Sequence, residues 1–354
     1  SDVLRDVPGV AVSRAGAVGG QTQIRIRGTE GNQVLVLIDG IEVADPYYGE
    51  YDFGTLIADP EARIEVLRGQ QSSLYGSDAI GGVIHYMTLT GAEAPGISAR
   101  AEGGSFETYT GSARVAGVAG QLDYAVSGAY YHTGGTPTAR NGTRDVGSDN
   151  LGLSAKLIWS PTDNFKVTGV GRYSYTRAET NNSEFDPNSP LFGYTVDSPG
   201  VYFKNEAFYG LIRAELSALE GRWTNALTGQ IADTTRDGYT PFGLDYGDKG
   251  QRLKGSYESS FRFGTDAIVH RLTGAVDVER ESFRNSSPFA FQGKRDTNNV
   301  GVVGQYELLV NDVFSFGGSV RHDDNDRFAN TTTYRVQGSY RLPTNTRIRA
   351  AWGT

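Results

Sequence analysis

Residues 65–84 read EVLRGQQSSLYGSDAIGGVI, a segment in which short apolar runs are repeatedly broken by glycine. Two shorter blocks that also end in glycine precede it, IRIRG at residues 24–28 and LVLIDG at residues 35–40. After residues 94–96 (APG) the pattern changes, and long strands with a two-residue period follow one another to the end of the sequence. A compact first domain followed by such strands predicts a membrane-spanning β-barrel whose lumen holds the first domain.

The composition favours strands and limits the kinds of site that the chain can form. Among 354 residues there are 47 Gly, 20 Tyr and 16 Phe, which suit strands, turns and aromatic surfaces better than helices. Without cysteine the chain forms neither a disulfide nor a thiolate metal site. The net charge of −8 gives no support to nucleic-acid binding, which normally needs a basic face. No run of about 18 apolar residues predicts a spanning helix, whereas barrel strands bury only alternate residues in lipid.

The alternation divides the chain into two expected domains, residues 1–93 and residues 94–354. In the second domain Leu253, Tyr257 and Phe261 alternate with polar neighbours such as Lys254 and Ser256. A charged face that recurs on so many strands does not suit a dry core, but it suits a wet lumen behind a lipid-facing exterior. We count about thirteen strands, and we expect both termini to be truncated. The residues expected to face lipid are Leu151, Leu153, Leu157, Tyr257, Phe261, Phe316, Tyr334 and Tyr340.

The connections between these strands alternate in length, as the short turns and long outer loops of such barrels do. Tight turns are expected near Pro161, Glu220, Asn311 and Pro343, where Gly, Pro, Asn or Asp makes a reversal easy. The longer polar stretches between them are residues 134–148, 178–204, 237–247 and 284–295. The long loops are therefore expected to gather at one end of the barrel.

The first domain is expected to contain one short helix at residues 2–7 and a mixed sheet of four strands. Its strands are expected at residues 23–27, 34–38, 64–67 and 82–87. Arg25 and Arg27 make one face of the first of these strands strongly cationic, and a buried Arg needs a carboxylate partner. We expect both, together with Arg63 and Arg68, to bind carboxylates across the boundary with the barrel; a solvated edge strand is the alternative.

The three Gly-ended blocks resemble, in their order and spacing, the plug domain of TonB-dependent outer-membrane transporters. The strongest match is RG at residues 68–69 followed by LYGSDAIGG at residues 74–82, and the blocks look most like the vitamin B12 (cobalamin) branch. The resemblance implies a bacterial outer-membrane barrel of about 22 strands filled by a small α/β plug. The plug-motif residues that it indicates are Arg25, Arg27, Gly28, Asp39, Gly40, Arg68, Gly69, Tyr75, Gly76, Gly81 and Gly82.

The same resemblance implies a function and a set of partners. It implies active import of a scarce, bulky nutrient such as cobalamin or an iron complex. The energy would come from the inner membrane through the TonB protein, whose binding box is absent from residues 1–93. Outer-membrane lipid and lipopolysaccharide would surround a monomer, with no nucleic acid bound.

The family that the blocks resemble binds its ligand on the outward apices of the plug and under the long loops. Residues 44–53 (ADPYYGEYDF) map to such an apex, and they contain more aromatics than a turn requires. Aromatic side chains give a large contact area at low entropic cost, which suits a flat ligand; a loop packed against wall aromatics is an equal alternative. The candidate ligand-binding residues are Asp45, Tyr47, Tyr48, Tyr51 and Phe53 on the plug, with Tyr239, Phe242 and Tyr246 in residues 237–247.

The sequence contains no recognisable enzymatic or metal site. Its four His residues are far apart, and no GxSxG, P-loop or GxGxxG motif occurs, so we expect neither an enzyme nor a cofactor. Asp145, Asp149, Asp186 and the acids of residues 323–326 could bind loop calcium, although they show no ordered ligand spacing. The alternatives to a cobalamin transporter are a ferric-siderophore or haem receptor, a soluble β-rich adhesin or lectin, and an outer-membrane protease or lipase.

Overall fold

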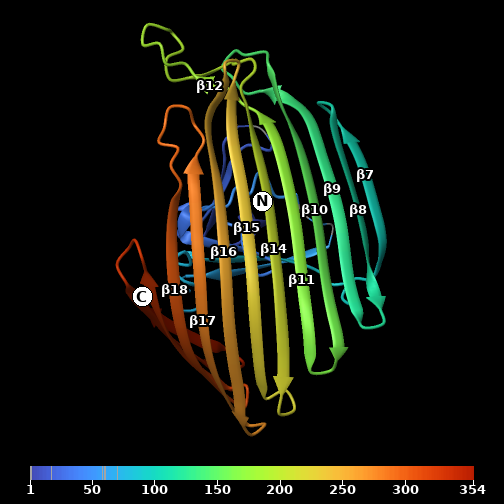
Figure 1. Cartoon of the computed structure of the whole chain (residues 1–354), viewed down its shortest axis with the longest axis vertical. Coiled ribbons are helices and arrows are strands. Elements are labelled where there is room, and N and C mark those ends of the chain that lie inside the picture. Colours follow the sequence, from blue (N-terminus) through green and yellow to red (C-terminus); the bar gives the residue numbers. More distant parts are fainter. Residues whose placement is uncertain (1, 17, 58, 60, 70) are drawn as a thin grey trace.

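A curved sheet of thirteen antiparallel strands forms most of the molecule, as the sequence predicted (Figure 1). The structure, a computed structural model, describes residues 2–16, 18–57, 59, 61–69 and 71–354. The strands are β7 (Gly96–Gly104), β8 (Thr108–Ala119), β9 (Leu122–Pro137), β10 (Asp145–Thr162), β11 (Phe165–Glu179), β14 (Tyr202–Ala218), β15 (Trp223–Thr240), β16 (Gly243–Gly264), β17 (Ile268–Asn285), β18 (Arg295–Val310), β19 (Phe314–Asn325), β20 (Thr331–Arg341) and β21 (Arg347–Gly353).

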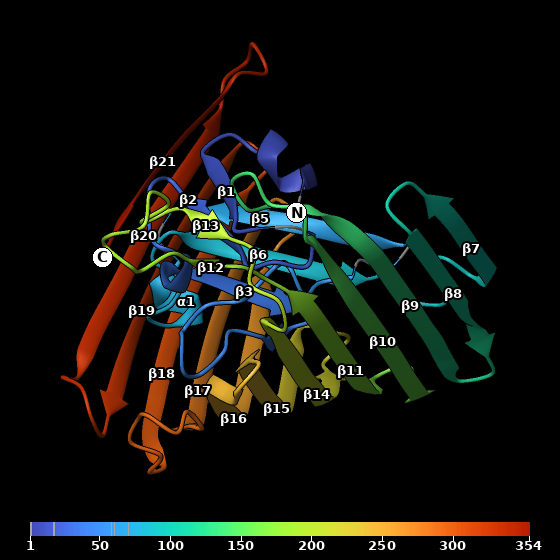
Figure 2. The same ribbon diagram turned by 90° about the horizontal axis from the view of Figure 1, so that it is seen from above.

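Each strand of this sheet pairs with its neighbours in chain order, from β7 at one edge to β21 at the other. Seen from above, the sheet bends into an open wall, and the first part of the chain lies against its concave side (Figure 2). The small two-stranded sheet of β12 (Asn182–Ser183) and β13 (Thr195–Val196) belongs to the connection between β11 and β14. The concave side of the wall is therefore the side on which a plug can act.

The two faces of the wall differ as the alternation predicted. Leu153, Leu157, Tyr257, Phe261, Phe316 and Tyr340 are exposed on the convex face. Leu151 and Tyr334 share that face and are half-buried, and the ring of Tyr334 packs 5.2 Å from that of Trp352. On the other face, Ser154, Lys156 and Lys254 bind residues of the first domain. The apolar side of the wall therefore faces outward and the polar side faces the lumen.

The short and long connections lie at opposite ends of the wall, with one difference from the prediction. Tight turns follow β10, β14, β18 and β20 as expected, and Leu219, Glu220, Asn311 and Asp312 adopt positive φ there. Residues 237–247, however, do not form a long loop. The strand β15 continues to Thr240 and β16 starts at Gly243, so only two residues connect them. The two strands stay paired up to this turn, with one irregularity between Gly238 and Tyr239, and project beyond the neighbouring strand ends (Figure 1).

The first domain contains a mixed sheet of four strands, in the order β4-β3-β6-β5. Parallel pairing of β3 with β6 and antiparallel pairing of the others make it mixed. Its elements are η1 (Asp2–Asp6), β1 (Val10–Arg14), β2 (Thr22–Ile26), η2 (Gly31–Gln33), β3 (Val34–Ile38), β4 (Ile41–Glu42), β5 (Ala62–Arg68), α1 (Ser72–Tyr75) and β6 (Gly82–Thr88).

Two details of the first domain differ from the prediction. The strand expected at residues 23–27 is β2, which pairs with β1 in a separate two-stranded sheet, while the short β4 completes the sheet of four. The expected helix at residues 2–7 is a 3-10 helix, η1. Among the described residues, every helix is too short or too polar to cross a membrane.

The main apolar core lies between the first domain and the wall. Ile26, Ile38 and Ile84 of the first domain are almost completely buried, and Val170 and Tyr209 of the wall belong to the same cluster. The hydroxyl of Tyr209 also donates to the Val43 carbonyl at 3.4 Å. The first domain is thus packed against the wall through a shared core, which fixes the position of its loops.

Candidate ligand-recognition site

The loop after β4 forms the outward apex of the first domain, and Asp45 shapes it. Its Oδ1 accepts hydrogen bonds from the backbone N–H groups of Tyr47 at 2.7 Å and Tyr48 at 3.1 Å. This is the local turn that an Asp side chain typically makes with the residues after it. Its Oδ2 accepts a hydrogen bond from Thr234 Oγ1 of β15 at 2.9 Å. Asp45 therefore ties the apex both to itself and to the wall.

Two of the predicted ligand-binding tyrosines form an aromatic cluster at this apex. Tyr47 and Tyr48 meet edge to face with ring centroids 4.9 Å apart, and they are 38% and 41% exposed. Tyr47 also packs 5.5 Å from Phe283, and its hydroxyl accepts a hydrogen bond from Asn285 Nδ2 at 3.2 Å. The Arg236 guanidinium lies 4.8 Å from the ring centroid of Tyr48. Plug and wall thus build one partly open aromatic surface with a cation beside it.

Tyr51 and Phe53 were predicted to contact the ligand, and the structure does not support this. Both are only 7% exposed, and they pack edge to face at 5.1 Å within the core shared with the wall. Burial raises the pKa of Tyr51 to about 12, so its hydroxyl stays neutral. Period-two reasoning did not apply to a loop, and composition alone gave no sign that the chain turns inward after Glu50.

The predicted residues near the β15–β16 turn separate into different places. Tyr246 lies in β16 beside Arg236, close enough for an electrostatic interaction with Tyr48, and so belongs to the apex cluster. Tyr239 instead stacks on Tyr202 of β14, with centroids 4.9 Å apart. Phe242 occupies the turn and is fully exposed. The three were grouped because residues 237–247 were read as a loop, whereas paired strands distribute them over different positions.

A small cavity of about 50 Å³ lies beneath the apex, between the plug and the wall. Asp52, Asn205 and Arg236 line it. Among the described residues, Asp52 Oδ2, Asn205 Oδ1 and Arg236 Nε are buried there without a hydrogen-bond partner. Unsatisfied buried polar atoms are costly, so these atoms form a floor ready to bind a small polar group.

Plug carboxylates and wall cations hold the two parts together below the apex. Glu42 forms ion pairs with Arg252 at 3.4 Å and with Lys254 at 3.1 Å, and Arg252 also donates to the Ala44 carbonyl at 2.9 Å. Glu279 and Glu281 of β17 bind the same two cations. Burial alone would raise the pKa of Glu42, but Arg252 and Lys254 hold it at about 2. Glu42 therefore stays charged inside the interface.

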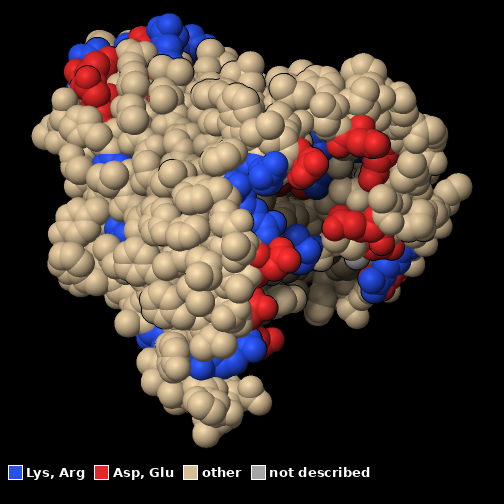
Figure 3. Space-filling view, turned by 90° about the horizontal axis from the view of Figure 1, so that it is seen from below, with Lys and Arg blue, Asp and Glu red and all other residues tan. Residues whose placement is uncertain are grey.

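A second group of ion pairs lies farther along the interface. Arg172 of β11 contacts Asp59 at 3.0 Å and Asp39 at 3.5 Å, and Lys156 of β10 contacts Asp39 at 3.2 Å. Burial opposes charge on Asp59, but Arg172 lowers its pKa, with help from Ser127 and Ser154. Seen from below, charged side chains gather around the hollow at the centre of the molecule (Figure 3).

The prediction that plug arginines bind carboxylates of the barrel is wrong. Arg25 pairs with Glu30 at 3.3 Å and Arg63 pairs with Glu65 at 3.3 Å, both within the first domain, and Arg68 donates to the Pro8 carbonyl. Arg27 lies exposed just beyond β2 with φ 55. The cations that cross the boundary come from the wall. Their signal was present in the sequence, because Lys156, Arg172, Arg252 and Lys254 all occupy lumen positions of the two-residue period.

Several of the plug-motif residues have a clear structural role. Asp39 is almost fully buried and accepts hydrogen bonds from the Thr88 backbone N–H at 2.9 Å and the Thr88 hydroxyl at 2.7 Å. At Gly82 an added Cβ would overlap the Leu67 carbonyl, so only glycine allows β5 and β6 to approach here. Tyr75 lies in α1, partly exposed. Positive φ is common to Gly28, Gly40, Gly69 and Gly76, whereas Gly81 packs directly against Thr29.

Two of the acids considered for calcium are bound by other side chains. Asp149 is bound by His132 at 2.7 Å and by the Tyr130 hydroxyl at 2.8 Å, and Asp323 is bound by Arg321 at 2.8 Å. In the part of the chain that the structure describes, no group of three or more His, Cys, Asp or Glu side chains is arranged to hold a metal ion.

Comparison with known proteins shows which family the chain resembles. The family model "TonB-dependent Receptor Plug Domain" matches residues 1–83. The vitamin B12 transporter BtuB of Photobacterium profundum is 28% identical over 360 residues, a match that covers 100% of this chain and 55% of that protein. The first 83 residues of this chain therefore match the plug domain of TonB-dependent receptors, and the whole chain is similar to a member of that family. It spans about half the length of this curated relative, and its relatives are transporters and receptors rather than enzymes.

Solved receptor structures share the fold of this chain. The siderophore receptor PirA of Acinetobacter baumannii superimposes with a TM-score of 0.76 at 20% identity, covering 99% of this chain and 57% of PirA. A mutant of the ferric enterobactin receptor PfeA of Pseudomonas aeruginosa, solved with enterobactin, gives 0.75 at 16% identity, covering 99% and 59%. The first domain thus has the fold of a receptor plug and the wall has the fold of part of a receptor barrel, the architecture of bacterial outer-membrane receptors.

Proposed function

We propose that the receptor to which this chain belongs binds a scarce, bulky nutrient at the outward apex of its plug. Import would then use energy supplied from the inner membrane through the TonB protein. The observation that carries the proposal is the apex itself, where Tyr47 and Tyr48 form an open aromatic surface on a plug anchored to the wall. The plug-domain match supports dependence on TonB.

A cobalamin-like molecule is the first choice of ligand. Support comes from the vitamin B12 transporter among the relatives and from the aromatic surface, which suits a large, flat, partly apolar molecule. The apex also offers Asn285, and the polar atoms that line the small cavity beneath it, for hydrogen bonds. In this reading Tyr47, Tyr48 and Tyr246 contact the ligand, while Asp45 holds the loop in shape.

A ferric siderophore or haem is the second choice, favoured by one specific observation. Arg236 places a cation directly beside the exposed ring of Tyr48, and a cation attracts the negative charge that such iron complexes carry. The salt dependence of ligand affinity distinguishes the two choices, because screening weakens the binding of an anionic ligand much more than that of a neutral one.

The experiment uses outer membranes that contain the full-length protein, with cyanocobalamin, ferric enterobactin and haemin as separate probes. Saturable binding of cyanocobalamin, and uptake that disappears in cells without TonB, is the expected result. If an iron complex binds and cyanocobalamin does not, the second choice of ligand replaces the first. If all three probes bind only at the background level of membranes without the protein, the proposed ligand classes are wrong.

A further inference from the structure

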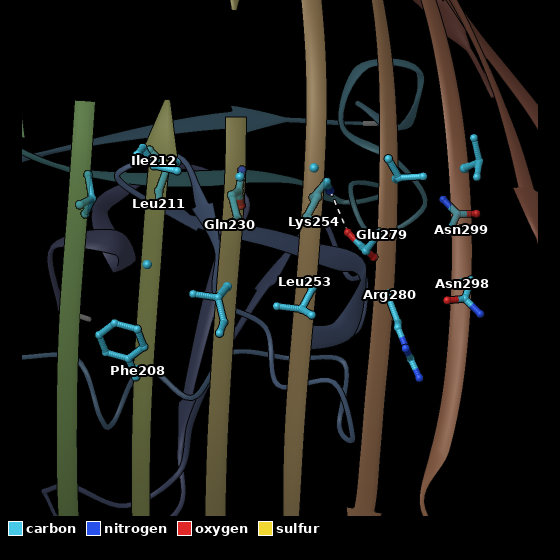
Figure 4. Close-up of a pocket in the computed structure, with 17 residues that line it drawn as sticks. Phe208, Leu211, Ile212, Gln230, Leu253, Lys254, Glu279, Arg280, Asn298 and Asn299 are labelled. Atoms are coloured by element: carbon cyan, nitrogen blue, oxygen red, sulfur yellow. Dashed lines mark ion pairs between the residues drawn. The ribbon is translucent and has the colours of Figure 1, made fainter. Parts of the chain in front are cut away.

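The small cavity beneath the apex has a chemical character that three side chains determine. Its volume is about 50 Å³, and it lies between the plug and the wall. Asp52 lines it from the plug, while Asn205 of β14 and Arg236 of β15 line it from the wall. Figure 4 shows another part of the wall, its outer face, where Phe208 and Leu253 are exposed. The cavity is therefore separate from the apolar outer surface of the barrel.

Hydrogen bonds within the plug fix the carboxylate of Asp52 and leave one of its oxygens for the cavity. Its Oδ1 accepts hydrogen bonds from the backbone N–H groups of Thr22 and Gly54, both at 2.8 Å. Its Oδ2 is buried, and within the described residues it has no hydrogen-bond partner. Because both bonds come from the backbone, this acceptor keeps its place whatever group enters the cavity.

The cavity presents two hydrogen-bond acceptors and one donor that are unpaired in the part of the chain that the structure describes. Asp52 Oδ2 and Asn205 Oδ1 are acceptors, whereas Arg236 Nε is a donor. The other carboxylates that line the cavity already accept hydrogen bonds from side chains: Asp45 from Thr234, Glu50 from Gln21 and Gln23, and Glu206 from Tyr173. One unpaired carboxylate oxygen beside one guanidinium suits a neutral polar group better than an ion.

Few chemical groups match two acceptors and one donor. An ammonium group would be repelled by Arg236, and a carboxylate would be repelled by Asp52. A hydroxyl group has a single O–H, so one buried acceptor would stay unpaired at a cost in free energy. A primary carboxamide has two N–H donors and a carbonyl acceptor, which pair all three atoms. Water offers the same groups, and a carboxamide that displaces it can reproduce its hydrogen bonds.

The size and position of the cavity also suit a group carried by the ligand. One water molecule needs about 10–15 Å³ of such space, so the cavity has room for the three heavy atoms of a carboxamide. Tyr48 lines the cavity, and its ring is 41% exposed at the apex. A ligand that lies on this ring can therefore extend a short side arm into the cavity.

We propose that the cavity binds a primary carboxamide of the ligand, with its N–H groups on Asp52 Oδ2 and Asn205 Oδ1 and its carbonyl on Arg236 Nε. This inference rests on the proposed function and narrows it, because the nutrient must then carry a primary amide. Cobalamin carries primary amides around its corrin ring, whereas enterobactin offers catechols and haem offers carboxylates. The cavity therefore favours the first choice of ligand over the second.

The first experiment tests the cavity without the nutrient. Saturation-transfer NMR on the detergent-solubilised full-length receptor measures the binding of acetamide, acetate and methylammonium, and we expect acetamide alone to bind. Asp52→Asn replaces an acceptor with a donor, and Asn205→Leu removes an acceptor, so each should weaken acetamide binding about tenfold or more. The matched control Asp233→Asn makes the same chemical change at an exposed carboxylate that accepts from Gln251, and it should bind acetamide as the parent does.

The second experiment tests whether the nutrient uses the cavity. Outer membranes that contain the full-length receptor are titrated with cyanocobalamin and with the monocarboxylic acids made by hydrolysis of one of its amides. At least one acid should bind about tenfold more weakly than cyanocobalamin, because its carboxylate meets Asp52. Asp52→Asn should reduce this preference for the amide, since it removes the repelling charge. A purely structural role of Asp52 would instead weaken both ligands equally and leave the preference unchanged.

The outcomes separate this inference from the proposed function. If acetamide binds no better than acetate, or binds equally to the parent, D52N and N205L, the cavity holds only water and the inference is wrong. If acetamide binds as expected but cyanocobalamin does not bind, the carboxamide site is supported and the choice of nutrient is wrong. Equal affinity for cyanocobalamin and every acid would show that no amide of the nutrient enters the cavity. Near-ultraviolet circular dichroism should show that all variants are folded.

Discussion

Asp78 is the residue through which pH should act on the anchoring of the plug. Burial raises its pKa, and the nearby Glu42 carboxylate raises it further, to about 7, despite the opposing Arg252. Glu281 adds to the negative charge around it, and a hydrogen bond from protonated Asp78 helps to keep Glu42 ionised. The folded protein thus binds a proton that the unfolded chain, with an ordinary value of 3.8, releases. The stability tied to this proton is complete below about pH 4 and lost as the pH rises through 7.

We therefore predict that Asp78→Asn makes the plug less sensitive to pH. The stabilising difference between variant and parent should grow from pH 4 to pH 7 and stay constant above it, since the amide does not titrate. Hydrogen exchange of the amides of residues 71–79, corrected for intrinsic rates, measures this difference in the full-length receptor. A difference that is the same at pH 5 and pH 8 would show that Asp78 does not hold the proton.

The tyrosines of the apex should divide into two kinds by their response to removal. Tyr47→Ala or Tyr48→Ala should weaken ligand binding by about 1–3 kcal/mol, as loss of an anchoring aromatic does, with little effect on folding. Tyr51→Ala should instead lower stability by about 3–5 kcal/mol, because it leaves a cavity in the shared core. Ligand titrations and urea unfolding of full-length protein distinguish the two effects. If Tyr47→Ala and Tyr48→Ala both bind the ligand as the parent does, the barrel loops rather than the apex recognise it.

At the scale of one strand, β16 offers a direct test of which face meets lipid. Tyr257 is exposed on the convex face, while Ser256 faces the lumen. Tyr257→Lys should destabilise the inserted barrel by about 2–4 kcal/mol, because a charge is placed in the hydrocarbon region. Ser256→Lys should cost much less, because its ammonium enters a polar lumen opposite Asp277. Unfolding of the full-length protein in lipid vesicles measures both costs, and equal values would contradict the orientation.

The strands also show how far sequence reasoning reaches. The two-residue period gave the number of strands and the face of Leu153 or Tyr257, because alternation is a local property of the backbone. It did not give the end of β15, since Gly, Asp and Tyr near residues 237–247 suit a loop as well as a projecting hairpin. It also missed Arg236 and Phe283 at the apex, because they reach Tyr48 and Tyr47 only through the fold of the whole chain.

At the scale of the whole molecule, the plug should depend on a few buried ion pairs rather than on the number of charges. Glu42→Gln leaves Arg252 and Lys254 paired only with Glu279 and Glu281, so it should cost about 1.5–3 kcal/mol, the range for a hydrogen bond to a charged group. The matched control Glu65→Gln breaks the exposed pair with Arg63 and should cost about 0–1 kcal/mol. The urea concentration at which the plug becomes accessible to protease measures both, and similar losses would contradict this ranking.

The contacts between plug and wall join residues that are far apart in the chain. Lys254 binds Glu42 across 212 residues, and the Ser73 hydroxyl meets that of Ser319 at 2.8 Å across 246 residues. Closing such long loops is slow, because chain entropy is lost before the contact forms. During synthesis the plug carboxylates are therefore complete before their cations, which emerge with β10, β11 and finally β16. We expect the plug to remain undocked until late in assembly, and an undocked plug would be a target for periplasmic chaperones. Pulse-labelled hydrogen exchange should show the amides of the plug protected only after those of β10 to β16.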